Sequence, residues 1–416
     1  MNTVIPGDGI WRGNESRTHS AGDGMRVVTK FGGTSLGNGD RINRAADSIA
    51  KAVEQGHEVA VVASAMGNTT DELIEEIEFE TDEADRAQIV SMGERTSVRM
   101  LKAALAARDI EAMFLEPGSD QWPIITDEHG EVDVEETTRR AHALAGQLGD
   151  VVPVITGFLA EDHQGNVTTL GRGGSDTSAV MLGKYMDADE VVIVTDVEGV
   201  MTGDPRVVEG ARNVSEITVD ELRNLSFRGA EVVAPSALSY KDADLSVRVV
   251  HYQHDDLLAG GTTIEGQFES LIDLEETQLA CVTIAGRAIR NSPGILGDLA
   301  SCLGDKEINI EANSSGMDSI TFYVAAADAD EAEALLHDEV VEDETLSSVT
   351  VEDDIAVVRV TGGEFSNENG GVKRVVDPLA DAHIELYDVI TSATSVSVFV
   401  PWDDREQALQ LVQKEF

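Results

Sequence analysis

The sequence predicts an α/β protein whose mostly parallel sheet is sandwiched by helices and is followed by two ferredoxin-like βαββαβ units. Three observations support this fold class. Short apolar strands alternate with helical patterns through the first two thirds of the chain, as in parallel sheets covered on both faces. Glycine-rich loops follow several of these strands, where open α/β sheets bind ligands. Beyond about residue 275 the order changes to β-α-β-β-α-β and then begins again, which indicates an internal repeat.

These patterns divide the 416 residues into four segments. Residues 1–24 are rich in Gly, Asn, Ser and Asp, and they predict a mobile N-terminal extension. Residues 25–272 form the α/β domain, residues 275–352 the first ferredoxin-like unit and residues 353–416 the second. The second unit lacks its last strand, so the two units are candidates for sharing or exchanging strands.

In the α/β domain the expected strands are apolar and short, and the expected helices follow a helical period. We expect strands at residues 25–30, 59–63, 110–115, 151–155, 191–196 and 245–250. We expect helices at residues 40–55, 84–108, 135–148, 175–185, 218–227 and 230–240. A hairpin over residues 158–170 leads directly into a glycine-rich turn, after which Ser175 and Asp176 can cap the next helix.

The repeat is predicted from a second series of strands and helices. In the first unit the strands are expected at residues 279–286, 308–313, 319–325 and 347–351, and the helices at residues 293–304 and 329–340. In the second unit the strands are expected at residues 355–360, 384–391 and 395–400, and the helices at residues 370–382 and 403–415.

The charge balance is strongly acidic, with 30 Lys and Arg against 78 Asp and Glu and a net charge of -48. Such a chain is a poor partner for nucleic acid or an anionic membrane. The acids are spread along the chain, and this composition resembles that of halophilic archaeal proteins.

No apolar run approaches the ~18 residues of a membrane span, and the chain is predicted to be cytoplasmic. Its two cysteines give neither a disulfide framework nor a zinc spacing, and no resident metal site is predicted.

Two glycine-rich segments suggest phosphoryl chemistry. Gly171, Gly173 and Gly174 surround an arginine at the start of a predicted helix, whose N-terminus attracts anions. Lys30 ends the first predicted strand and is followed by two more glycines, whereas no P-loop motif occurs. Phosphoryl transfer needs positive charge and N–H donors around the moving group, and these segments can supply both. A capped turn without a ligand is the simpler alternative for either segment alone.

Taken together, the ordered motifs at residues 30–35, 64–67, 93–95, 156–158, 171–176 and 195–206 resemble those of the aspartate kinases, an amino-acid kinase fold followed by tandem ACT domains. The resemblance covers roughly residues 25–416. It implies ATP-dependent phosphorylation of the side-chain carboxylate of L-aspartate to 4-phospho-L-aspartate. This reaction is the first step toward lysine, threonine and methionine.

The resemblance also assigns roles to individual residues. Lys30 would hold the phosphates and stabilise transition-state charge, and Asp176 would orient Lys30 or help with Mg²⁺. Arg172 would bind the substrate α-carboxylate, because a planar guanidinium fork suits a carboxylate. Glu94 would bind the α-ammonium. Further residues complete the two binding sites: Thr69 and Ser175 in the amino-acid pocket, and Gly32, Gly33, Thr195, Asp196 and Arg206 near ATP.

In the repeat, residues 291–297 followed by residues 308–311 resemble the ACT pattern, in which a loop-to-helix turn binds a small amino acid. The residues implied are Asn291, Pro293, Gly294, Ile295 and Asn309. The expected effector is lysine or threonine, and the ACT units are expected to pair between subunits in a homo-oligomer. A ferredoxin-like dimerisation module without ligand is the alternative.

The chain departs from the family pattern at the nucleotide edge. Met201 stands where the family usually has tyrosine, and Glu231 stands where it usually has lysine. Two other functions therefore remain open: an amino-acid sensor whose kinase half has lost catalysis, and another amino-acid or carbamate kinase of the same fold. Glu94 and the tandem ACT repeat argue against the second of these.

Overall fold

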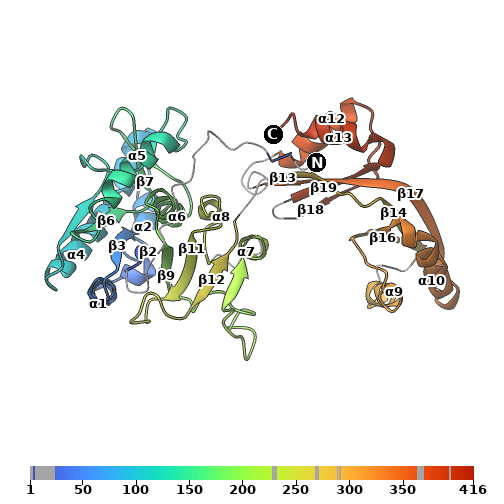
Figure 1. Cartoon of the computed structure of the whole chain (residues 1–416), viewed down its shortest axis with the longest axis horizontal. Coiled ribbons are helices and arrows are strands. Elements are labelled where there is room, and N and C mark those ends of the chain that lie inside the picture. The colour runs from blue at the N-terminus through green and yellow to red at the C-terminus, as the bar shows by residue number, and fades with distance from the viewer. Residues whose placement is uncertain are drawn as a thin grey trace. The chain divides into compact units, whose positions relative to one another are not determined.

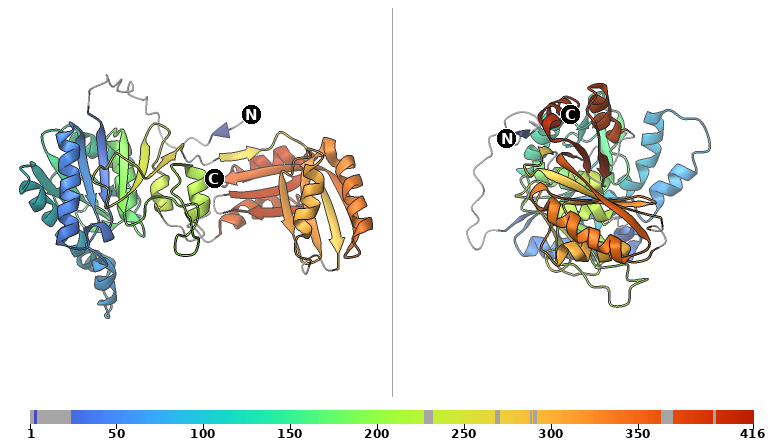
Figure 2. Two further views of the ribbon diagram at one scale, coloured as in Figure 1. Left: turned by 90° about the horizontal axis from the view of Figure 1, so that it is seen from below. Right: turned by 90° about the vertical axis from the view of Figure 1, so that its right-hand side faces the viewer.

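The computed structural model describes residues 3–4, 24–226, 232–267, 271–287, 289, 292–362, 370–392 and 395–416. The chain forms two compact units, and each is described by itself. One covers Arg12–Phe268; the other covers Glu269–Phe416 together with the N-terminal strand Thr3–Val4. They are coloured from blue to yellow-green and from yellow to red along the chain in Figures 1 and 2. The predicted mobility of residues 1–24 lies almost wholly outside the described residues.

The first unit is built on an eight-stranded sheet of order β10-β12-β11-β9-β2-β3-β6-β4. The strands in this order are Glu216–Thr218, Thr262–Glu265, Ser246–His251, Glu190–Thr195, Arg26–Phe31, Glu58–Ala63, Val152–Thr156 and Ala112–Leu115. All neighbouring pairs are parallel except β11 and β12. The predicted mostly parallel sheet is confirmed.

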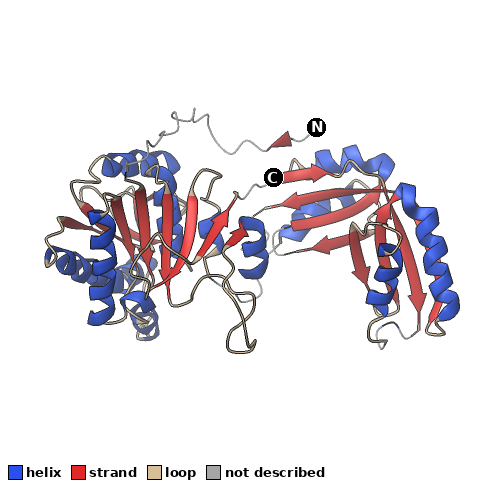
Figure 3. Ribbon diagram, turned by 60° about the horizontal axis from the view of Figure 1, so that its bottom comes forward, coloured by secondary structure: helices blue, strands red, loops and turns tan. Residues whose placement is uncertain are grey.

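Helices cover both faces of this sheet, as the apolar character of its strands predicts (Figure 3). On one face lie α1, Gly39–Glu54, and α4, Met92–Ala106. On the other face lie α5, Val134–Ala145, α6, Gly174–Tyr185, and α8, Pro235–Leu238. The remaining helices of the unit are α2, Thr69–Glu75, α3, Glu83–Val90, and α7, Val219–Ser226.

The parallel register brings the carboxyl ends of the central strands to one edge of the sheet. Phe31 of β2 pairs with both Ala63 of β3 and Val194 of β9. Ala63 also pairs with Thr156 of β6, and Thr195 of β9 pairs with His251 of β11. The loops that follow these strands therefore lie along the same edge, where ligands bind in open α/β sheets.

The predicted helix over residues 84–108 is two helices, α3 and α4, with a break at Ser91. The Ser91 hydroxyl donates to the Gln88 carbonyl at 2.7 Å and accepts from Arg95 Nε at 3.0 Å. A serine that satisfies backbone and side-chain groups in this way favours a helix end over a helix interior. The break gives α4 its own N-terminus, directly before Glu94.

The start of α6 also differs from the prediction. Gly173 is the residue that precedes the helix, in the left-handed conformation with φ 75°, and no side chain caps the helix. A β-carbon at Gly173 would lie 2.3 Å from the β-carbon of Ala234. Glycine is therefore required for both its conformation and its lack of a side chain. Ser175 and Asp176 are left free for other contacts.

A three-stranded sheet accompanies the main one, built from β5, Ile125–Thr126, β7, Leu159–Asp162, and β8, Val167–Thr169. Strands β7 and β8 form the hairpin predicted over residues 158–170. The Leu170 N–H donates to the Phe158 carbonyl at 2.8 Å, so the hairpin is closed immediately before the glycine-rich turn.

The second unit contains two ferredoxin-like sheets with the same strand order, joined into one sheet. The first sheet has order β17-β14-β16-β15 and the second has order β13-β17-β19-β18. The strands are Leu271–Leu274 (β13), Leu279–Gly286 (β14), Ala312–Ser315 (β15), Ser319–Ala325 (β16), Leu346–Thr361 (β17), Asp388–Thr391 (β18) and Ser395–Pro401 (β19). The helices are Ile295–Gly304 (α9), Ala329–Glu342 (α10), Gly371–Asp381 (α12) and Arg405–Val412 (α13).

The two ferredoxin-like sheets share strands in two ways. The long strand β17 supplies the last strand of the first sheet and the first strand of the second (Figure 1). Strand β13 lies before the first sheet in the chain, yet it pairs with residues 358–361 of β17 and completes the second. Ile272 of β13 packs in the same apolar cluster as Val358. Residues 271–272, predicted to end the α/β domain, belong instead to the second sheet. β1, Thr3–Val4, pairs with the other side of β13.

Candidate active site

The centre of the site is an ion pair between the two glycine-rich segments that the sequence singled out. Lys30 Nζ, near the end of β2, lies 2.7 Å from Asp176 Oδ1 in the first turn of α6. Both side chains are about seven-eighths buried. Asp176 Oδ2 also accepts the Ala234 N–H at 3.1 Å. These contacts therefore hold the Lys30 ammonium against the Asp176 carboxylate at the carboxyl edge of the sheet.

Two loops at this edge approach each other more closely than side chains would allow. The Gly67 N–H donates to the Gly33 carbonyl at 2.9 Å. A β-carbon at Gly33 would lie only 2.5 Å from the Gly67 oxygen. The Gly32 N–H is bound to the Val194 carbonyl at 3.1 Å, which ties the same loop to the end of β9. Gly32 and Gly33 thus place the backbone beside Lys30, whose Nζ would lie 3.4 Å from a β-carbon at Gly32.

Glu94 is a buried carboxyl group, only 3% exposed, in the first turn of α4. Its Oε1 accepts bonds from the Ala65 N–H at 3.3 Å and the Thr70 hydroxyl at 3.1 Å. Within the described part of the chain, its buried Oε2 has no hydrogen-bond partner. Burial raises the pKa of Glu94 to about 7, against the lowering effect of these hydrogen bonds. A cation bound at Oε2 would satisfy the oxygen and hold the group ionised.

The Thr69 hydroxyl is used within its own turn, because it donates to the Met66 carbonyl at 2.6 Å. The neighbouring Thr70 is the residue that reaches Glu94, and the sequence reasoning missed it. Two adjacent threonines at the start of a helix give no sequence signal for which hydroxyl faces the pocket. Thr69 positions the loop that carries the Ala65 N–H.

Ser175 and Arg172 flank the ion pair on the glycine-rich turn. The Ser175 side chain packs against Gly157, where a β-carbon would lie 2.7 Å from Ser175 Oγ. Arg172 is exposed, and among the described residues its guanidinium has no hydrogen-bond or ion-pair partner. An unpaired guanidinium beside a buried ion pair is available to a carboxylate ligand.

At the nucleotide edge, the described side-chain contacts are local. Thr195 and Asp196 follow β9, and the Thr195 hydroxyl lies 3.3 Å from Asp196 Oδ1. Arg206 is highly exposed and forms a bidentate pair with Asp204, at 3.0 and 2.9 Å. The described contacts thus hold Arg206 in a turn and do not join it to Thr195. Met201 forms an isolated bridge with Asn213, and Glu231 lies outside the described residues.

In the second unit, the residues predicted to bind an effector lie at the start of α9. Gly294, with φ 95°, precedes the helix, Ile295 begins it, and Pro293 is exposed beside them. Asn309 Nδ2 donates to Glu311 Oε1 at 2.6 Å. Asn291 lies outside the described residues. The second ferredoxin-like sheet repeats this turn, because Gly370, with φ 119°, precedes α12.

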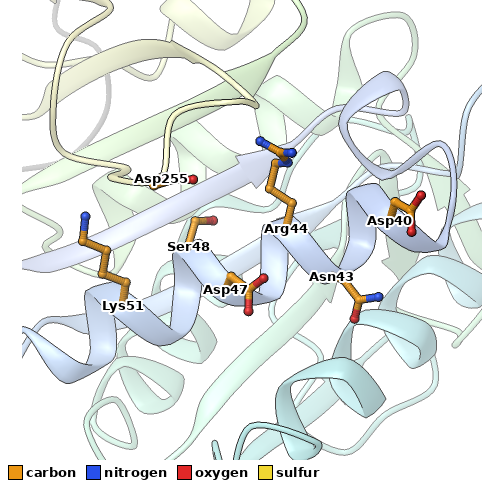
Figure 4. Close-up of a pocket in the computed structure, with 7 residues that line it drawn as sticks. All are labelled: Asp40, Asn43, Arg44, Asp47, Ser48, Lys51 and Asp255. Atoms are coloured by element: carbon orange, nitrogen blue, oxygen red, sulfur yellow. The ribbon is translucent and has the colours of Figure 1, made fainter.

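Neither of the two largest clefts given by the described residues is lined by Lys30 or Asp176. A groove of about 400 Å³ runs along α1 and faces Asp255 on a neighbouring loop (Figure 4). Two of its charged groups are paired with residues outside the groove: Asp47 with Arg108 Nε at 2.6 Å and Lys51 with Asp256 at 3.2 Å. In the second unit, a cleft of about 340 Å³ opens over Phe399 and Val357, with Arg359 on its wall. The sequence reasoning identified neither cleft.

Two features are absent from the described residues, a metal-binding cluster and a membrane-spanning helix. No group of three or more His, Cys, Asp or Glu side chains in these ranges is arranged to hold a metal ion. Nor does any helix there combine the length and apolar character needed to cross a membrane.

Comparison with protein-family models gives matches over most of the chain. Residues 25–251 match the model of the amino acid kinase family. Residues 282–340 and residues 350–414 each match a model of the ACT domain. The first match contains every predicted catalytic and substrate-binding residue, and the other two fall on the two ferredoxin-like sheets.

Relatives and solved structures agree with the family models. The chain is 30% identical to the aspartokinase of Corynebacterium glutamicum over 94% of this chain and 96% of the relative, and 32% identical to that of Geobacillus stearothermophilus over 90% and 93%. An aspartate kinase structure from Synechocystis matches with a TM-score of 0.76 at 27% identity, covering 93% of this chain and 69% of that one.

Two structures of E. coli aspartokinase III also match, one in complex with aspartate and ADP and one with lysine and aspartate. Each has a TM-score of 0.52 at 25% identity; the alignments cover 94% and 93% of this chain and 99% and 98% of theirs. The chain therefore belongs to the aspartate kinases, members of the amino acid kinase family with two ACT domains.

Proposed function

We propose that this protein transfers the γ-phosphoryl group of ATP to the side-chain carboxylate of L-aspartate, forming 4-phospho-L-aspartate and ADP. The observation that carries the proposal is the buried Lys30–Asp176 pair at the carboxyl edge of the sheet, with Nζ and Oδ1 2.7 Å apart. It holds a cation beside two glycine-rich loops, residues 32–33 and 171–174, whose backbones a ligand can approach closely. Positioned charge of this kind is the main catalytic requirement of phosphoryl transfer.

The amino-acid pocket supports aspartate through two opposite charges. Among the described residues, the Arg172 guanidinium has no partner and suits the α-carboxylate, and the buried Oε2 of Glu94 has no partner and suits the α-ammonium. Ser175 lies between the glycine-rich turn and Gly157, and Thr69 supports the loop beside Glu94. The E. coli aspartokinase III structure that contains aspartate and ADP is consistent with both ligands.

The chemical step needs no general base in this arrangement. The side-chain carboxylate of aspartate is ionised at neutral pH and attacks the γ-phosphorus directly. A new bond forms between the carboxylate oxygen and phosphorus as the bond from phosphorus to the ADP oxygen breaks. Lys30 stabilises the charge on the transferring group, and Asp176 keeps the Lys30 ammonium in place.

Mg²⁺ would arrive with the nucleotide, because this ion commonly binds phosphates and water with only one or two protein carboxylates. Asp176 is the carboxylate of the glycine-rich turn that could contact it. Gly32 and Gly33 would approach the phosphates, and Thr195, Asp196 and Arg206 the rest of the nucleotide. Arg206 would have to leave Asp204 to do so.

We further propose that the ACT units regulate the enzyme. Pro293, Gly294, Ile295 and Asn309, with Asn291, would bind lysine or threonine as a feedback effector, and the units would pair between subunits in a homo-oligomer. The related E. coli structure with lysine and aspartate supports lysine as a candidate. In this role the enzyme would begin the synthesis of lysine, threonine and methionine in the cytoplasm.

The experiment is a coupled assay of ADP release with ATP and Mg²⁺, run at high salt with aspartate, glutamate or N-acetylglutamate as acceptor. We expect release that depends on aspartate. Release with glutamate or N-acetylglutamate instead would identify another kinase of the same fold. No release with any acceptor would favour the amino-acid sensor, for which Met201 and Glu231 are the sequence support.

A further inference from the structure

Arg95, the residue after Glu94, makes contacts that the reaction does not explain. It lies in the first turn of α4, and its side chain is only 16% exposed. Arg95 Nη1 lies 2.9 Å from Glu116 Oε1, and Nη2 donates to the Pro117 carbonyl at 3.4 Å. With the bond from Nε to Ser91, all three guanidinium nitrogens are engaged. Arg95 therefore links the first turn of α4, which contains Glu94, to the loop that follows β4.

That loop, residues 116–119, is itself closed and fixed. The Glu116 N–H donates to Ser119 Oγ at 3.2 Å, and the Ser119 N–H donates to the Glu116 carbonyl at 2.9 Å. Arg99, one turn further along α4, also donates twice to the Glu116 carboxylate, at 2.6 and 2.8 Å. Burial alone would raise the pKa of Glu116, but the bonds from Arg99 and the charge of Arg95 outweigh it and lower the pKa. Glu116 is thus held as a carboxylate.

The far side of the loop contacts the hairpin that leads to Arg172. The Gly118 N–H donates to the carboxylate of Glu161 in β7. Strand β7 pairs with β8, and the hairpin closes where the Leu170 N–H meets the Phe158 carbonyl, two residues before Arg172. Gly118 has φ 95°, a conformation that favours glycine and turns its N–H toward the hairpin.

These contacts, here named the Arg95 network, comprise Arg95, Glu116, Gly118 and Glu161. They connect the two elements that carry the opposite charges of the amino-acid pocket, α4 with Glu94 and the hairpin before Arg172. We propose that the Arg95 network fixes the separation of Glu94 from Arg172 and so sets the selectivity for aspartate over glutamate. The inference rests on the proposed function, in which these two groups hold the α-ammonium and α-carboxylate.

The physical reason is the small difference between the two acceptors. Glutamate is longer by one methylene, and a pocket distinguishes one methylene by only about 1–3 kcal/mol. Binding groups must stay within about 0.5 Å of their productive positions, which requires fixed supporting contacts. Loss of the network would let Glu94 and Arg172 move. The distance from the side-chain carboxylate of aspartate to the phosphate would then vary.

The test removes the network from either end, with Arg95→Gln and Glu161→Ala as separate variants. Each should raise KM for aspartate about tenfold and lower the aspartate-to-glutamate ratio of kcat/KM by a similar factor, while KM for ATP changes less than about twofold. The matched control is Arg108→Gln, which breaks a comparable contact with Asp47 at the other end of α4. The control should leave all three quantities within about twofold.

Hydrogen exchange gives a second readout that needs no substrate. Arg95→Gln should speed exchange in peptides over residues 116–122 and also over residues 159–170, whereas Arg108→Gln should change neither. Faster exchange confined to residues 116–122, or an unchanged aspartate-to-glutamate ratio in both network variants, would overturn the inference. If the wild type releases no ADP with aspartate, the proposed function fails, and the exchange result alone decides whether the network couples the two elements.

Discussion

At the residue scale, Arg172 and Lys30 have different proposed roles: Arg172 binds aspartate, and Lys30 acts on the phosphate. Arg172 is exposed and unpaired among the described residues, while Lys30 is buried against Asp176. We expect Arg172→Ala to raise KM for aspartate by about 10²-fold, because a charge-assisted contact to the substrate is lost. Lys30→Ala should chiefly lower kcat, by 10² or more on the scale of lost transition-state contacts. Steady-state kinetics of both variants checks this, and the opposite pattern would reverse the two roles.

The buried carboxyl of Glu94 predicts how aspartate binding depends on pH. Burial raises the pKa of Glu94 to about 7, so in the free enzyme the group takes up a proton as pH falls below this value. The neutral acid cannot pair with the α-ammonium. KM for aspartate should therefore rise up to tenfold per pH unit below about 7 and level off above it, while KM for ATP serves as the internal control. A flat profile for aspartate between pH 5.5 and 8 would contradict the role of Glu94.

The same pKa shift predicts that the stability of the fold changes with pH in the opposite direction to aspartate binding. Because the folded protein holds the Glu94 proton more tightly than the unfolded chain does, it binds more protons between about pH 4.5 and 7. The contribution of Glu94 to the free energy of unfolding therefore falls as pH rises through this window. The site thus favours aspartate at the pH where Glu94 stabilises the fold least, as expected for a binding group whose Oε2 is buried without a partner among the described residues.

Individual site residues were predictable to different degrees. Lys30 and Asp176 were singled out from glycine-rich motifs, and the structure joins them directly. The contact of Thr70 with Glu94 was missed, since only the turn geometry decides which of two adjacent hydroxyls faces the pocket. The capping roles expected for Ser175 and Asp176 were wrong, because Gly173 occupies that position and Lys30 engages the Asp176 carboxylate.

At the element scale, the start of α6 offers a test with a matched control. Gly173 and Gly171 have similar left-handed conformations, with φ 75° and 71°. A β-carbon at Gly173 would collide with Ala234, whereas a β-carbon at Gly171 would meet no atom within 4 Å. Gly171→Ala should cost about 1–2 kcal/mol from backbone conformation alone, and Gly173→Ala about 1–3 kcal/mol more from overpacking.

Denaturant unfolding at constant high salt measures the difference between these variants. Equal midpoints for Gly171→Ala and Gly173→Ala would contradict the close approach of α6 to residue 234. Because both substitutions add the same methyl group in the same backbone region, conformational strain cancels in the comparison. The remaining difference reports the contact that also delivers the Ala234 N–H to Asp176.

The order of elements was largely predictable, but their long-range partners were not. Apolar strands alternating with helices identified the parallel sheet, since a strand buried on both faces has a distinctive composition. The break at Ser91 was missed because the local sequence stays favourable to helix, and the contacts of Ser91 with Gln88 and Arg95 decide it. The pairing of β13 with β17 joins residues more than 80 positions apart, and no local pattern reports such a pairing.

At the scale of the whole molecule, the net charge of -48 predicts dependence on salt. Like charges repel across the folded surface, and the screening length falls from about 10 Å at 0.1 M salt to about 3 Å at 1 M. We expect Tm to rise steeply between 0.1 M and 3 M KCl. Thermal unfolding followed by circular dichroism checks this, and a Tm that stays flat over the range would refute halophilic adaptation.

The central claim is that the buried Lys30–Asp176 pair serves phosphoryl transfer to aspartate, and its most direct test is capture of the product. Incubation with ATP, Mg²⁺, aspartate and hydroxylamine in about 3 M KCl, chosen to screen the charge, should convert the acyl phosphate to aspartyl hydroxamate. We predict hydroxamate that requires both ATP and aspartate and that falls by 10² or more in Lys30→Ala. No hydroxamate from the folded wild type, or undiminished hydroxamate from folded Lys30→Ala, would contradict the account.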